Sequence, residues 1–154
     1  MDIKELKPTS IWHYFDAITG VPRPSKKEER IREFLLNFAK EQNLEVKVDK
    51  TENVVITKEA TPGCEGAPTV ILQAHMDMVC EKNGDVKHDF ERDPIETYID
   101  GEWVKARGTT LGADNGIGMA AAMAVLADKE LKHGRIQALF TVDEETGLNL
   151  LDFR

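Results

Sequence analysis

The sequence has few cysteines and no long apolar run. Its 154 residues include two cysteines, Cys64 and Cys80, in unrelated contexts, so a disulfide framework is not expected. No apolar stretch approaches the roughly 20 residues that a membrane-spanning helix needs, and the polar residues 1–5 lack the apolar core of a signal peptide. These absences predict a soluble, cytoplasmic protein.

Basic residues are also in deficit. The chain has 28 acidic and 20 basic residues, a formal net charge of -8, and the most basic stretch, residues 26–32, alternates with acids. A surface of this sign repels phosphate groups, so neither nucleic acid nor an anionic membrane is expected as a partner. The length is that of one domain or part of one, and it is sufficient to bury a core.

Hydrophobic periodicity predicts an α/β fold with a mixed central sheet flanked by helices. Ser25 followed by Glu28 has the pattern of a capping box, which predicts a helix that runs to about Gln42. The nearly continuous apolar run 69–74 predicts a central strand covered on both faces. The other predicted elements are a helix from Thr9 or Ser10 to about Ala17, a buried helix at 117–126, a central strand at 135–142, and hairpins at 45–57 and 96–106.

His75 and Asp77 form the first of three candidate site segments. At the end of an extended strand, side chains two residues apart face the same way, so these two can lie side by side while Met76 and Met78 face the core. A carboxylate on one imidazole nitrogen fixes the tautomer of a histidine that binds metal through the other nitrogen. A His-x-Asp pattern by itself is more often a chance surface pair.

Two acidic segments complete the set. Asp114 lies in a glycine-flanked loop where its carboxylate could bridge two cations, or it caps the helix that starts near Gly116. Glu144 and Glu145 end a predicted strand, and the turn at 146–147 allows both to converge; the alternative is a solvated acidic turn. Adjacent carboxylates repel one another unless cations offset their charge. Because sites in α/β proteins gather at strand ends, the three segments together predict one metal site.

Three longer stretches resemble a known family in order and spacing. They are residues 75–83 (His-Met-Asp-Met-Val-Cys-Glu-Lys-Asn), the pair 88–90 (His-Asp-Phe) and 93–95 (Asp-Pro-Ile), and the glycine-rich 108–118. The sequence resembles the zinc-dependent aminoacyl-histidine dipeptidases (Xaa-His dipeptidases), which belong to the co-catalytic metallopeptidase group with aminoacylases and glutamate carboxypeptidases. The resemblance extends from about Ser10 to Gly147.

The resemblance implies a co-catalytic zinc exopeptidase fold and a binuclear zinc site, with Co²⁺ or Mn²⁺ as alternative metals. It implies that His75 binds zinc, Asp77 orients it, Asp114 bridges two ions, Glu145 binds the second ion and Glu144 is the general base. Glu144 would take a proton from water that attacks a peptide carbonyl, and would pass it to the leaving amine. The implied substrate is a dipeptide with a C-terminal histidine.

Other features of the family have no clear counterpart in these 154 residues. They are one more carboxylate ligand after Glu145, a distant histidine, and a lid domain that mediates dimerisation. Within these residues, the resemblance also implies a cis peptide bond between Asp114 and Asn115. Asp152 is the only acidic residue after Glu145, and 148–154 lacks the expected small-residue helix start. We therefore expect 1–154 to be the N-terminal portion of a catalytic domain, truncated before the lid domain, with two ligands per metal and a homodimer only in a full-length form.

Three functions stay open from the sequence. The first is hydrolysis of Xaa-His dipeptides, and the second is related chemistry on another dipeptide, a tripeptide or an N-acyl amino acid. The third is a catalytically silent α/β fragment or interaction module, which the missing ligands favour. Among the remaining reactive residues, His88 is expected to be structural, His13 and His133 exposed, and Cys80 a buried and inert thiol.

Overall fold

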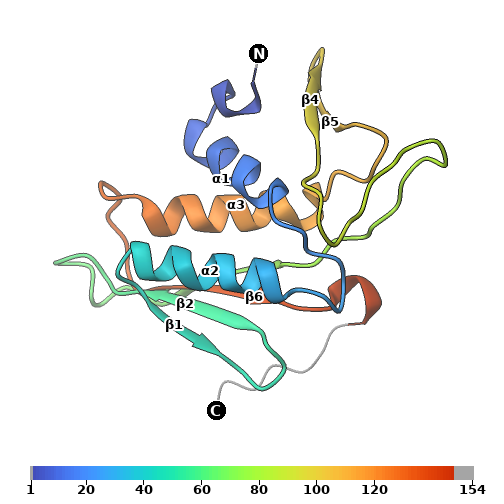
Figure 1. Ribbon diagram of the computed structural model, residues 1–154. Helices are drawn as coiled ribbons and strands as arrows, with labels where there is room; N and C mark the ends of the chain where they lie inside the picture. Colours follow the sequence, from blue (N-terminus) through green and yellow to red (C-terminus); the bar gives the residue numbers. More distant parts are fainter. Residues whose placement is uncertain (1, 148–154) are drawn as a thin grey trace.

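The computed structural model describes residues 2–147, whose centre is a four-stranded mixed sheet in the order β1-β2-β6-β3 (Figure 1). β2 pairs antiparallel with β1 and with β6, whereas β3 and β6 are parallel, with His75 opposite Thr141. Parallel pairing brings the C-terminal ends of β3 and β6 to the same edge of the sheet. The strands are β1 (Glu45–Val48), β2 (Val54–Lys58), β3 (Val70–His75) and β6 (Ile136–Thr141).

α2 and α3 cover one side of this sheet, and α1 packs on α3 (Figure 1). α3 packs on β3 and β6 and also contacts α1, while α2 packs on β1 and β2. Apolar residues from all three helices and from alternate positions of β2 and β6 form one buried core. The helices are α1 (Thr9–Thr19), α2 (Glu29–Glu41) and α3 (Ala113–Ala127).

The remaining elements are short. β4 (Thr97–Asp100) and β5 (Trp103–Ala106) form a separate antiparallel hairpin beside the helices, joined by the predicted turn at Gly101. One 3-10 turn, η1 (Ile3–Glu5), precedes α1, and another, η2 (Glu144–Thr146), follows β6. The predicted α/β class, both hairpins and the helix at 117–126 are confirmed, although the last begins at Ala113.

The predicted capping box is wrong. α2 begins at Glu29, and its N-cap residue Glu28 makes no side-chain capping hydrogen bond. Ser25 Oγ instead donates to Asp77 Oδ2 (2.6 Å), and Glu28 Oε1 accepts from the backbone N–H of Asp143 (3.0 Å). Both side chains therefore bind the site segments rather than their own helix. The predicted Thr9 or Ser10 cap of α1 is also wrong, because the N-cap position is Pro8.

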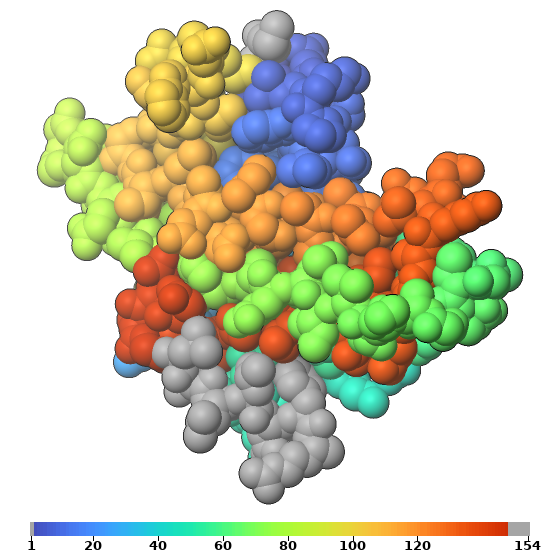
Figure 2. Space-filling view, turned by 180° about the vertical axis from the view of Figure 1, so that it is seen from behind, coloured from blue at the N-terminus to red at the C-terminus, as the bar shows by residue number. Residues whose placement is uncertain are grey.

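The predicted burial of β3 on both faces is wrong as well. β3 is at the edge of the sheet, and Val70 and Ile71 are 52% and 62% exposed. The segment that contains β3 lies at the surface in the view from behind, in green (Figure 2). An apolar run indicates a strand that suits burial, but it does not give the strand order. The C-terminal end of β3, at Ala74 and His75, is buried.

No helix within residues 2–147 is long and apolar enough to cross a membrane.

Candidate metal centre

His75 closes β3 and is 7% exposed. Its Nδ1 lies 2.9 Å from the carbonyl oxygen of Asp77 and 3.2 Å from Asp77 Oδ1, while its Nε2 lies 2.8 Å from Asp114 Oδ1. Met76 and Met78 are buried on the opposite side, as the alternation of the strand predicts. Asp77 thus fixes the imidazole through Nδ1, and Nε2 is directed at the exposed carboxylate of Asp114.

Asp77 is fully buried and receives several donors. The backbone N–H groups of Glu144 and Glu145 donate to its two carboxylate oxygens at 3.1 and 3.2 Å, in addition to the bond from Ser25. Burial alone would raise the pKa of Asp77, but hydrogen bonds from His75, Ser25 and these two amides outweigh it and lower the pKa to about 2. Asp77 is therefore a permanently charged group that ties the end of β3 to the acidic turn.

Asp114 reaches the site from the start of α3, where it and Asn115 have non-helical backbone angles. Gly112 there has φ +73°, and the peptide bond between Asp114 and Asn115 is cis, which confirms the expectation from the resemblance. The Asp114 side chain is 84% exposed, and no backbone N–H of α3 donates to it. Its contact with His75 therefore supports the metal-site interpretation over the alternative that Asp114 caps the helix.

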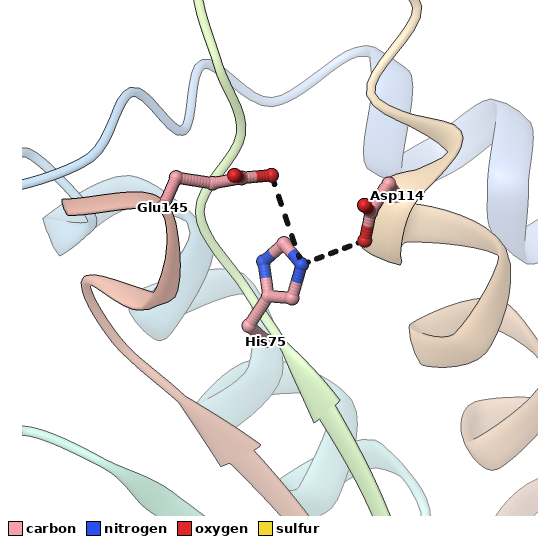
Figure 3. Close-up of side chains that lie close together, drawn as sticks. All are labelled: His75, Asp114 and Glu145. Atoms are coloured by element: carbon pink, nitrogen blue, oxygen red, sulfur yellow. Dashed lines mark hydrogen bonds and ion pairs between the residues drawn. The ribbon is translucent and has the colours of Figure 1, made fainter. Parts of the chain in front are cut away.

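Glu144 and Glu145 both turn toward His75. Asp143 adopts the left-handed conformation, with φ 56°, and the chain bends into η2 immediately after β6. As a result, Glu144 Oε2 and Glu145 Oε1 lie 3.8 and 3.9 Å from His75 Nε2. Figure 3 shows the carboxylates of Glu145 and Asp114 both directed at the same nitrogen of the imidazole. The predicted convergence of the two glutamates is confirmed.

The donor set of this cluster suits a divalent transition metal. One ligand atom each from His75, Asp114 and Glu145 lies within 4.8 Å of the others, and this is the one such group of three within residues 2–147. An imidazole nitrogen with two carboxylate oxygens matches the three protein ligands of a catalytic zinc site, whose fourth position stays open. Histidine with carboxylate also suits cobalt or manganese.

The remaining candidate residues lie outside this cluster. His88 packs edge-to-face on Phe90, with ring centroids 4.5 Å apart, and Cys80 is half-buried, with a pKa that burial raises. His13 is exposed, as predicted. His133 is half-buried, so its predicted exposure is wrong: its backbone N–H donates to Thr61 Oγ1 at 3.0 Å.

Arg23 and Ser25 were missed as site residues. The sequence pattern attributed Ser25 to a helix cap and gave Arg23 no role, because both act through contacts with residues far along the chain. The one sequence signal for a role of these residues is the rigid segment Pro22-Arg23-Pro24, which contains Arg23 and directly precedes Ser25.

The metal-free cluster should release a proton when it binds metal. Burial lowers the pKa of His75, but hydrogen bonds to Asp77 and Asp114 outweigh it and raise the pKa from 6.5 to about 9. His75 is therefore protonated at neutral pH in the metal-free chain, and a ligating imidazole must lose that proton. We expect release of about one proton per ion at pH 7, and tighter binding as pH rises toward 9.

Calorimetric titration of the metal ion in buffers of different ionisation enthalpy measures this release. The same shift makes the stability that His75 contributes to the metal-free chain fully present below about pH 6.5 and lost as pH rises through about 9. Identical binding heats in all buffers would show that no proton is released. They would contradict the assignment of His75 as a ligand that is protonated before the metal binds.

The chain is similar in sequence and in fold to known peptidases. A family model described as peptidase family M20/M25/M40 matches residues 71–151, more than half of the chain. The cytosol non-specific dipeptidase of Escherichia coli (strain K12) is 51% identical over 148 residues, which are 96% of this chain and 30% of that protein.

Solved peptidase structures share this fold. The aminoacylhistidine dipeptidase of Vibrio alginolyticus has a TM-score of 0.94 at 55% identity, covering 96% of this chain and 30% of its own. A tripeptidase of Staphylococcus aureus has a TM-score of 0.73 at 25% identity, covering 90% and 37%. The chain thus spans between 30% and 37% of the length of these relatives. It belongs to the peptidase family M20/M25/M40.

Proposed function

We propose that this chain binds a divalent metal ion through His75, Asp114 and Glu145, and that the resulting site hydrolyses the peptide bond of dipeptides. The observation that carries the proposal is the convergence of these three donors beside Glu144. Zinc is the expected metal, with cobalt or manganese as substitutes. This proposal assigns Glu145 to the same ion as His75, in place of the second ion that the resemblance implies, because all three donor atoms lie within 4.8 Å of one another. Asp114, the most exposed of the three, is proposed as the bridge to a second ion.

The residues of the chain have separate tasks in this reaction. Asp77 holds the imidazole of His75 so that Nε2 faces the ion. Glu144, which is 44% exposed, accepts a proton from water as that water attacks the peptide carbonyl, and then donates it to the leaving amine nitrogen. A bound metal would supply polarisation of the carbonyl and a lower pKa for water.

We propose dipeptides with a C-terminal histidine as the preferred substrates. The support is the 55% identity to the Vibrio protein named an aminoacylhistidine dipeptidase. The second candidate is a broader range of dipeptides, which the name of the Escherichia coli relative, a non-specific dipeptidase, favours. That name also supports a cytoplasmic location.

We further propose that residues 1–154 correspond to the N-terminal portion of the catalytic domain. The chain covers 30% of the length of its dipeptidase relatives. The further carboxylate and histidine ligands, the lid domain and its dimer contacts are assigned to the portion of the protein that this sequence does not include.

The test is to measure metal binding and hydrolysis on the same preparation. The chain is titrated with zinc, cobalt and manganese, and is assayed with β-alanyl-histidine, other dipeptides, a tripeptide and an N-acetyl amino acid. Turnover that a chelator removes and metal restores supports the proposal. Bound metal without turnover reduces the function to metal binding, and absence of both identifies a silent α/β module.

Asp114→Ala is expected to remove metal binding without unfolding the chain. The side chain is 84% exposed, and after its loss Glu144 and Glu145 still lie 3.8 and 3.9 Å from His75 Nε2, so the fold should be retained. A structural zinc site binds with about 10 to 16 kcal/mol, so the loss of one ligand should weaken affinity about 100-fold or more. Isothermal titration measures the affinity, and thermal unfolding checks the fold. Asp85→Ala, an exposed aspartate outside the cluster, is the matched control. Equal affinity in the two variants would rule out Asp114 as a ligand.

A further inference from the structure

We propose that Arg23 is a positioning residue of the metal centre: its guanidinium fixes the turn after β3, which carries Asp77, relative to the start of α3, which carries Asp114. The inference rests on the proposed metal-binding function and adds a residue that contacts neither the metal ligands' side chains nor the expected substrate.

The contacts of Arg23 join two segments that are distant in sequence. Nη1 donates to the carbonyl oxygens of Met76 (3.1 Å) and Asp77 (3.2 Å), and Nη2 donates to that of Gly112 (2.5 Å). The carbonyl oxygen of Asp77 also lies 2.9 Å from His75 Nδ1. Because a guanidinium is a rigid planar fork, these bonds set the separation of the two segments and not merely their proximity.

The backbone of the same residue is also anchored to the site. The carbonyl oxygen of Arg23 accepts from the backbone N–H of Met78 (3.0 Å), and Pro24 forms a parallel bridge with Met78. The next residue, Ser25, donates to the Asp77 carboxylate. The side chain of Arg23 therefore starts from a fixed point beside β3 and extends to the glycine loop.

Two glycines make room for this side chain. A Cβ at Gly112 would lie 2.5 Å from Arg23 Nη2, and one at Gly116 would lie 2.8 Å from it. The guanidinium thus packs directly against the backbone on both sides of Asp114. Arg23 is 1% exposed.

The acceptors of Arg23 indicate that it fixes the backbone and does not neutralise a carboxylate. Within residues 2–147 no ion pair includes Arg23, and all three of its acceptors are backbone carbonyls. A buried guanidinium that donates to backbone carbonyls of two segments holds those segments in place. This matters for a metal site because its ligands tolerate displacements of only about 0.5 Å.

The test compares Arg23→Met with Arg23→Lys in the 154-residue chain. Arg23→Met should weaken cobalt or zinc binding about 10- to 100-fold, the range seen when groups behind metal ligands are removed. It should also change the visible spectrum of the cobalt-loaded chain, and shift the amide NMR signals of 76–78 and 112–116 but not those of β1 and β2. Arg23→Lys, which keeps a donor and the charge, should restore part of the affinity.

Leu35→Ala is the control for general destabilisation, since Leu35 is a fully buried core residue of α2 and does not belong to the candidate site. It should lower the melting temperature without altering the cobalt spectrum or the loop signals. Should Arg23→Met fail to fold, Gly116→Ala displaces the guanidinium while retaining Arg23, and the same loop shifts and weaker metal binding are expected.

The two proposals fail in different ways. If the wild-type chain binds no metal, the proposed function is wrong. The positioning role of Arg23 is then still tested by the NMR shifts of the loop amides and of the His75 side-chain nitrogens in the metal-free variants. If Arg23→Met, or Gly116→Ala in its place, folds with loop signals and metal affinity unchanged, the positioning role is wrong.

Discussion

Asp77→Asn is expected to destabilise the chain and to weaken metal binding in the same variant. Asp77 is fully buried and accepts from Ser25 and from the backbone N–H groups of Glu144 and Glu145. An amide in its place turns one acceptor oxygen into a donor, which faces another donor. The loss of a buried charged partner costs about 3 kcal/mol or more. Urea unfolding of the metal-free chain measures this effect.

The smaller change Ser25→Ala gives a reference for the loss of unfolding free energy in Asp77→Asn. Ser25→Ala removes a single hydrogen bond to a charged group and should cost about 1.5 to 3 kcal/mol. Both variants should also weaken metal binding, because Asp77 orients His75. If Asp77→Asn unfolds at the wild-type urea concentration, Asp77 does not join the strand end to the acidic turn.

Glu144→Gln is expected to abolish most turnover while metal affinity stays at the wild-type level. Glutamine keeps the shape of the side chain but accepts no proton at neutral pH. A positioned general base contributes about 10²- to 10⁴-fold to rate, so kcat should fall by that factor. Glu144 is 44% exposed, and its backbone N–H still reaches Asp77, so the fold should be retained. Steady-state kinetics with saturating metal and a metal titration measure the two quantities separately.

Glu130→Gln is the matched control for this change, because Glu130 is an exposed glutamate outside the metal cluster. It should leave both kcat and affinity unaltered. A Glu144→Gln variant with full turnover would exclude Glu144 as the base, and one with lost metal binding would make Glu144 a ligand instead.

Local patterns in the sequence predicted most of the elements but not the order of the strands. The hairpin turn at Asp100-Gly101 and the apolar helix after Gly116 depend on residues close in sequence, and both were correctly predicted. The continuously apolar run Val70-Ile71-Leu72 predicts a central strand, whereas β3 lies at the edge of the sheet. Whether such a run lies at the centre or the edge depends on which other strands are present, and no local pattern contains that information.

The same distinction applies to the site. Residues that face the metal position carry their own signal, since a strand-end histidine and adjacent carboxylates have few other physical uses together. Arg23 and Ser25 act on backbone groups and on a carboxylate far along the chain, and a capping box explained Ser25 equally well. Only the folded chain separates a helix cap from a donor to Asp77.

The two edges of the sheet also differ in how the structure can grow. β1 carries Glu45 and Lys47 along its free edge, which discourages a further strand, whereas β3 has no charged residue before His75. A parallel strand added to β3 would end beside His75, and the residue that follows it would face the exposed side of the carboxylates. Within residues 2–147, the outer edge of β3 and the candidate metal ligands therefore lie on the same side of the molecule, because His75 ends that strand.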